Sequence, residues 1–180
     1  MNGQEETAIR SSHRLGRPWR PAPVVIAIVI ITCFIEFLLE ASDLGLVGTT
    51  RWRAFAYENG AFWVGLLDNW RPNYPTQPWL MFLSYQGLHT GFSHLLGNMI
   101  VLLIVGHIVV GRVGQSWFAA IYLVSGIGGA LGFALLSDSA QPMVGASGAL
   151  FGLVGAWKWQ DWFFDKQYGY NRKSLIIDIL

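Results

Sequence analysis

Long apolar runs separated by short polar segments make up most of this chain. The runs cover residues 24–44, 88–110, 117–136 and 146–163, and a further one begins at residue 174. A helix needs about 20 apolar residues to cross the hydrocarbon core of a bilayer, because each residue advances it by about 1.5 Å. The pattern therefore predicts an all-α polytopic membrane protein, a bundle of four transmembrane helices with the start of a fifth.

Two segments are too polar to cross a membrane. Residues 1–23 hold four arginines and end in Pro-Ala-Pro, which is typical of a solvated tail. Residues 49–86 mix charged side chains with aromatic ones, among them Trp52, Trp63, Trp70 and Trp79. Such a mixture suits the membrane–water interface. We therefore predict a cytoplasmic tail over residues 1–23 and a membrane domain over residues 24–180, which includes an interfacial loop over 49–86.

The distribution of lysine and arginine predicts which side of the membrane each loop faces. Nine of these residues lie in the tail, in the 111–116 turn and in the 158–173 stretch. The opposite side carries three, at Arg51, Arg53 and Arg71. Positive charge concentrates on the cytoplasmic side of membrane proteins, so we expect a multi-pass protein of the inner or plasma membrane with a cytoplasmic N-terminus.

Composition agrees with a membrane protein and narrows the function. The chain is 53% hydrophobic and 13% charged, with a mean hydropathy of +0.40, which lies on the membrane side of ordinary composition. Its net charge of +1 and scattered basic residues argue against a nucleic-acid surface. Cys33 is the only cysteine, and no set of histidine, cysteine and carboxylate residues has metal-ligand spacing. We therefore expect no metal and no other cofactor.

Small residues recur at four-residue steps in the fourth apolar run. Gly148, Gly152 and Ala156 share one face of the predicted helix, and the third run holds Ser125 and the glycines at 126, 128, 129 and 132. Small residues let helix backbones approach closely. The pattern predicts tight packing of the fourth helix, which would position whatever lies at its start.

Three polar residues share one predicted level in the membrane. The second and fourth helices both run inward from the outer side, so their first turns lie at similar depth. Ser147 begins the fourth helix, while His94 and Asn98 share a face of the second. If that helix starts at Leu88, His94 lies about 9 Å below its start. An interhelical hydrogen bond is the alternative to a catalytic role for each of the three.

The residues around the serine favour chemistry. In the segment Gly145-Ala146-Ser147-Gly148 the glycines leave space around the hydroxyl. A helix N-terminus also supplies unpaired N–H groups that can stabilise an oxyanion. From the residues alone His94 is the candidate general base, because among the histidines of the spans it lies near the depth of Ser147. His107 lies about 20 Å deeper along the same helix.

Two segments together resemble the signature segments of the rhomboid family of intramembrane serine proteases. They are His89-x4-His94-x3-Asn98 in one span and Gly145-Ala146-Ser147-Gly148 at the start of the span after next. The resemblance runs from about Pro78 to Trp159. It also covers the tryptophan-rich loop before the second span, which is similar to the family's membrane-embedded first loop.

The resemblance implies a role for each residue. Ser147 would be the nucleophile, and His94, Asn98 and the Ser147 backbone N–H would form the oxyanion hole. His89 would be a structural histidine near the site, with Gly145 and Gly148 beside it. This assignment moves His94 from general base to oxyanion stabilisation.

The resemblance also implies a function and its alternatives. It indicates an intramembrane serine endopeptidase that cleaves transmembrane protein substrates within the lipid bilayer, near the outer membrane face. The family's general base is a histidine on the sixth span, which would lie beyond Leu180, so residues 1–180 alone are expected to be inactive. A catalytically inactive relative that binds membrane helices is the main alternative. A small transporter or channel subunit, with His94 and Asn98 along a polar path, is a third possibility.

Overall fold

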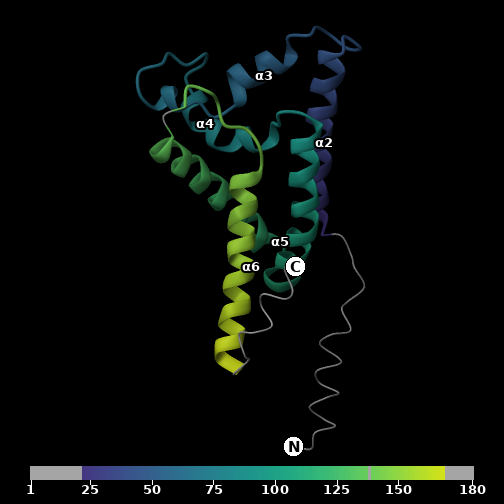
Figure 1. Cartoon of the computed structure of the whole chain (residues 1–180), viewed down its shortest axis with the longest axis vertical. Helices are drawn as coiled ribbons and strands as arrows, with labels where there is room; N and C mark the ends of the chain where they lie inside the picture. The colour runs from purple at the N-terminus through teal and green to yellow at the C-terminus, as the bar shows by residue number, and fades with distance from the viewer. Residues whose placement is uncertain (1–21, 138, 169–180) are drawn as a thin grey trace, which may run out of the picture.

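The computed structural model describes residues 22–137 and 139–168. Its elements, in chain order, are α2 (Pro23–Asp43), α3 (Trp52–Gly60), η1 (Val64–Leu67), α4 (Gln77–Ser84), η2 (Tyr85–Gly87), α5 (Phe92–Leu136) and α6 (Ser147–Tyr168) (Figure 1). The described ranges form no strand, only one isolated antiparallel bridge between Phe62 and Met143. The chain is therefore a polytopic helical membrane protein, as its apolar pattern predicts.

The helix α2 starts and stops at local signals in the sequence. Pro23 occupies its first turn, where the missing N–H costs no helical hydrogen bond. At the other end Gly45 has a φ of 70°. The Gly45 N–H donates to the Ser42 carbonyl at 2.9 Å and the Leu46 N–H donates to the Ala41 carbonyl at 2.8 Å. This is the Schellman arrangement, which satisfies the last carbonyls of a helix and turns the chain away.

The helix α5 contains both the second and the third predicted spans. Its two halves, 92–113 and 115–136, meet at Gly114, whose φ of 82° and ψ of 169° are not helical. Each half is about 33 Å long, enough to cross a bilayer core of about 30 Å. The second half turns back toward the level at which α5 begins (Figure 1).

The expected helix start at Leu88 is wrong. The helix begins at Phe92, because Gly91 adopts a φ of 117° and serves as its N-cap. That backbone conformation lies in the region that favours glycine. His94 is therefore in the first turn of α5 and does not lie 9 Å below its start.

The helix α6 is longer and more polar than the fourth predicted span. It extends to Tyr168, beyond the expected end at residue 163. Near this end the guanidinium of Arg112 pairs with the Asp161 carboxylate at 2.6 Å. By length and hydropathy α2 and α5 can cross a membrane, and α6 is not among these helices. The predicted fifth span, from residue 174, lies outside the described residues.

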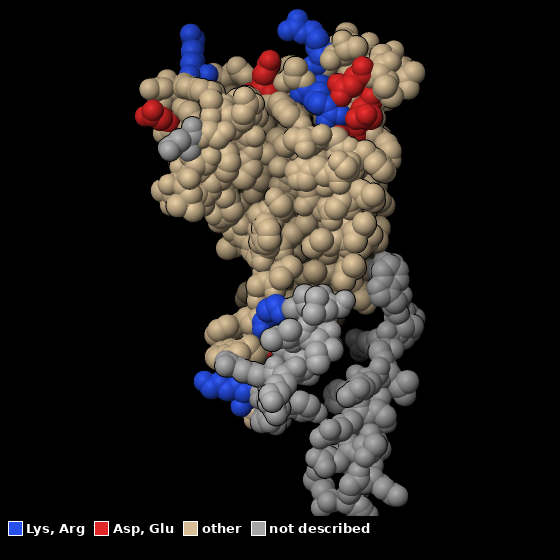
Figure 2. Space-filling model, in the orientation of Figure 1, with Lys and Arg blue, Asp and Glu red and all other residues tan. Residues whose placement is uncertain are grey.

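The core lies where α2, α5 and α6 meet. Val25, Leu102, Phe118 and Leu153 are buried there. The loop 49–86, with α3 and α4, covers one end of these helices, which we call the loop end (Figure 1). Charged side chains gather at the loop end and again near the opposite end, and the surface between them carries no charged side chain on the face shown (Figure 2). This division of charge fits a protein whose middle section lies in a bilayer.

Candidate active site

A groove of about 540 Å³ opens between the first half of α5 and the start of α6. Its polar lining includes Ser147, His94 and Asn98, the three residues that the sequence places at one level. Its apolar lining comes from both helices: Val101, Leu150, Phe151 and Val154. The structure therefore brings the serine, the histidine and the asparagine into one mostly apolar groove.

The loop 49–86 holds the turn that leads into Ser147. The backbones of Phe62 and Met143 exchange two hydrogen bonds, of 3.0 and 2.9 Å. The Gly145 N–H donates to the Tyr85 carbonyl at 2.9 Å. These bonds join the turn after α5 to the loop and so determine where α6 begins.

The start of α6 presents unpaired N–H groups beside Ser147. The Leu150 N–H is bonded to the Ala146 carbonyl at 3.0 Å. The N–H groups of Ser147 and Gly148 come before it, so neither can have a partner within the helix. Groups of this kind can donate to an oxyanion that forms next to the serine hydroxyl.

Gly145 brings the backbone before the serine against His94 and Asn98. Its φ is 112°. A Cβ atom built on Gly145 would lie 2.7 Å from His94 Cε1, 3.0 Å from His94 Nε2 and 3.6 Å from Asn98 Nδ2. Only glycine fits at this point, both for its backbone angle and for its lack of a side chain.

The hydrogen bonds of Asn98 and His94 leave one Asn98 hydrogen and the Nε2 atom of His94 available toward the groove. The Asn98 Nδ2 donates one hydrogen to the His94 carbonyl at 3.1 Å, and its second hydrogen remains. The Nδ1 atom of His94 lies 3.1 Å from the hydroxyl of Thr90. The Nε2 edge of the ring is therefore the one that faces Gly145 and the serine segment.

The predicted close packing of the fourth helix is confirmed. A Cβ atom on Gly148 would lie 3.3 Å from the Gly129 Cα and 2.9 Å from the Tyr85 hydroxyl. A Cβ atom on Gly152 would overlap the side chain of Ser125. The two helices thus touch through backbone and small side chains, which keeps the start of α6 in place.

His89 lies beside the site without lining the groove. It is fully buried, and its ring meets the His94 ring edge to face with 5.1 Å between centroids. Neither of its ring nitrogens has a partner among the described residues. If both histidines lay in one helix, as the sequence suggests, they would not share a face. They meet because the residues from Leu88 to Gly91 are not helical.

Sequence reasoning missed a cluster of charged residues that supports the segment before α5. Arg53 of α3 bonds three carboxylates on α2: Glu36 at 2.8 Å, Glu40 at 3.1 Å, and Asp43. Arg53 also donates to the His89 carbonyl at 3.0 Å. The spacing of the three carboxylates, which puts them on one helical face, is a signal that could have revealed a basic partner. We call these four residues the Arg53 clamp.

The Arg53 clamp keeps its guanidinium charged. Burial lowers the pKa of Arg53, but hydrogen bonds to Asp43 and Glu36 outweigh this and leave the pKa raised. Tyr57 adds a second donor to the same His89 carbonyl at 2.6 Å. The clamp therefore ties α2, α3 and the backbone next to the candidate site together.

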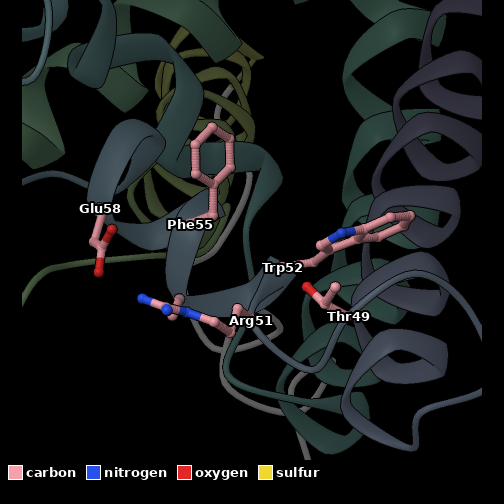
Figure 3. Close-up of a pocket in the computed structure, with 6 residues that line it drawn as sticks. Thr49, Arg51, Trp52, Phe55 and Glu58 are labelled. Atoms are coloured by element: carbon pink, nitrogen blue, oxygen red, sulfur yellow. The ribbon is translucent and has the colours of Figure 1, made fainter.

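A second cavity in the described part of the chain differs from the groove. A cavity of about 420 Å³ on α3 is lined by Arg51, Trp52, Phe55 and Glu58, but their side chains point in different directions (Figure 3). His107 lies on the same half of α5 as His94, about 20 Å further from Ser147. The described residues contain no group of three or more histidine, cysteine or carboxylate side chains that could hold a metal.

The chain is similar to known proteins over this region. The profile of the rhomboid domain matches residues 75–179. RHOMBOID-like protein 2 of Arabidopsis thaliana is 37% identical over 115 residues, which cover 63% of this chain and 30% of that protein. Rhomboid protease GluP of Bacillus subtilis is 40% identical over 78 residues, 43% of this chain and 15% of that protein.

An inactive relative matches as well. Inactive RHOMBOID-like protein 8 of Arabidopsis thaliana is 35% identical over 117 residues, which cover 65% of this chain and 28% of that protein. The chain spans less than a third of the length of each of these three relatives.

Proposed function

Because the chain belongs to the rhomboid family, whose domain covers residues 75–179, we propose that it forms the nucleophile-bearing part of an intramembrane serine endopeptidase. Its substrates are transmembrane proteins, cut near the outer membrane face. The similar family members include a protease and an inactive protein, so family membership alone does not decide whether this chain is catalytic. The residues of the site must decide it. The observation that carries the proposal is that Ser147, His94 and Asn98 line one groove.

In this proposal Ser147 attacks the carbonyl carbon of the scissile peptide bond. Its position at the first residue of α6 supports this role, because the hydroxyl lies next to N–H groups that have no helical partner. The attack converts the carbonyl oxygen to an oxyanion in a tetrahedral intermediate. The Ser147 N–H, the second hydrogen of Asn98 Nδ2 and the Nε2–H of His94 would donate to that oxygen.

The proton of the Ser147 hydroxyl must pass to a general base and then to the leaving amine. The described histidines do not suit this role: His89 is buried outside the groove, and His107 lies too deep. His94 borders the groove, and we assign it to the oxyanion. By resemblance to the family, a histidine on a later span, beyond Leu180, supplies the base.

The apolar lining of the groove suits a substrate from the membrane. Val101, Phe151 and Val154 lie deeper along the helices than the serine. A hydrophobic peptide segment can pack against them while its backbone reaches Ser147 from the loop end. Water for the hydrolysis of the acyl-enzyme would enter from the loop end, where charged residues gather.

A catalytically inactive relative that binds membrane helices is the second candidate. The matching inactive family member supports it. In that case the groove would hold a helix of another membrane protein, and Ser147 would form no covalent intermediate. The two candidates differ in whether the serine reacts.

Labelling of the purified full-length protein with a fluorophosphonate probe separates these candidates. We expect covalent labelling that disappears in Ser147→Ala and persists in Ser93→Ala, because Ser93 lines the same groove but lies on α5 with His94 and Asn98, whereas Ser147 faces them from α6. Cleavage of a transmembrane substrate should fall by about 1,000-fold or more in Ser147→Ala. Labelling that is absent in the wild type, or equal in all three proteins, would contradict the protease.

A further inference from the structure

Thr90 makes the side-chain hydrogen bond to the ring of His94. Its hydroxyl oxygen lies 3.1 Å from Nδ1 of His94. Thr90 is exposed and lies just before Gly91, whose φ of 117° turns the chain into α5. This turn places a residue outside the helix next to a ring in its first turn. The groove described above does not include Thr90.

Contacts on three sides hold the His94 ring. Thr90 lies at Nδ1, and the His89 ring packs against it at 5.1 Å between centroids. On the third side a Cβ atom on Gly145 would lie 3.0 Å from Nε2. The Nδ1 atom of the ring therefore faces Thr90, and the Nε2 atom faces the segment that leads to Ser147.

The position of the proton on this ring decides what His94 can do. A neutral imidazole carries one proton, so one nitrogen donates and the other accepts. If the Thr90 hydroxyl donates to Nδ1, Nε2 carries the proton and can donate to an oxyanion. If Nδ1 carries the proton and donates to Thr90, Nε2 can only accept, and the ring cannot stabilise negative charge.

We propose that Thr90 is a positioning residue whose hydroxyl donates to Nδ1 of His94 and so keeps the proton on Nε2, directed at the groove. The hydroxyl rotates freely and can donate, and it requires no charge on the ring. The consequence for catalysis rests on the proposed function. The tautomer of His94 does not, and it can be measured without a substrate.

Nitrogen-15 NMR of the histidine side chains in the full-length protein, in detergent micelles, tests this assignment. The signal of His94 is identified by its loss in His94→Gln. We expect the wild type to show an unprotonated Nδ1 and a protonated Nε2. Thr90→Val keeps the volume and removes the hydroxyl, so it should give a mixture of tautomers. Thr90→Ser restores the hydroxyl and should return the wild-type spectrum.

The rate of fluorophosphonate labelling at Ser147 gives a second readout. We expect Thr90→Val to slow the covalent step by about tenfold, with little change in the concentration of probe that half-saturates the rate. Thr90→Ser should label at nearly the wild-type rate. A variant that had only lost stability would not show a slower covalent step with an unchanged half-saturating concentration of probe. Nor would Thr90→Ser restore its rate.

The outcomes separate the two proposals. A wild type that carries the proton on Nδ1, or identical spectra for Thr90→Val and the wild type, would overturn the role of Thr90 and leave the protease standing. A wild type that resists labelling while its spectrum shows Nε2–H, lost in Thr90→Val, would overturn the protease and support the hydrogen bond.

Discussion

The Arg53 clamp and the contact between α5 and α6 hold the same bundle together by opposite means. In the clamp, one long side chain reaches carboxylates on α2 and a backbone carbonyl next to the site. At Gly148 and Gly152 of α6 no large side chain separates the helix from α5, and the two backbones come close together. The clamp stabilises the loop end by ion pairs, whereas the glycines stabilise the position of α6 by close packing.

This difference predicts how each region tolerates change. A contact between backbones has no flexible part, so an added side chain must move a whole helix. A charged contact can lose one partner and let water reach the other, since Arg53 is 19% exposed. We therefore expect substitutions at the glycines to cost more than substitutions in the clamp.

The largest expected effect is that of Gly152→Leu. A side chain at this position overlaps Ser125 on α5, and the overlap involves the Ser125 Cβ, which cannot rotate away. We expect the free energy of unfolding to fall by about 3 kcal/mol, measured by thermal unfolding of the full-length protein in detergent micelles. Gly155→Leu is the matched control, because a Cβ at Gly155 meets nothing within 4 Å. Equal melting temperatures for the two variants would contradict the backbone contact.

A smaller loss is expected for Arg53→Ala. The change leaves Glu36 buried, 2% exposed, without its partner. Breaking a buried ion pair is costly, but the partly exposed guanidinium reduces the loss here to about 2 kcal/mol. Arg51→Ala, at the exposed N-cap position just before the same helix, should change stability by less than about 0.5 kcal/mol. Similar losses for both arginines would mean that the clamp contributes no more than an ordinary surface charge.

The two regions also differ in how far the sequence reveals them. The stripe of Gly148 and Gly152 follows helical periodicity, so the close packing could be predicted from spacing alone. The level shared by Ser147 and His94 followed from counting apolar runs. Arg53 and Glu36 are 17 residues apart, on separate helices, and no local pattern pairs them. Such a contact depends on how the loop folds back over α2.

The segment between the regions shows a second limit of sequence reasoning. The run from Leu88 to Val110 is mainly apolar, which predicts a helix that begins at Leu88. The positive φ of Gly91 breaks it, and the contacts of His89 and Thr90 with His94 depend on that break. Glycine in a mainly apolar run is compatible with helix packing as well as with a turn, so its spacing could not decide between them.

The smallest expected effect is that of Tyr85→Phe, beside the contact between α5 and α6. Tyr85 is fully buried, and its hydroxyl donates to the Gly126 carbonyl at 2.7 Å, close to Gly148. Burial raises its pKa to about 12, so the hydroxyl keeps its proton at neutral pH. Removing the hydroxyl should cost about 1 kcal/mol of stability, measured by thermal unfolding in micelles. The Tyr85 backbone carbonyl still accepts from the Gly145 N–H, so labelling of Ser147 should change by less than about twofold. A large loss of labelling with unchanged stability would contradict this expectation. It would mean that the Tyr85 hydroxyl affects the reactivity of Ser147 directly and does not only stabilise the packing of α5 on α6.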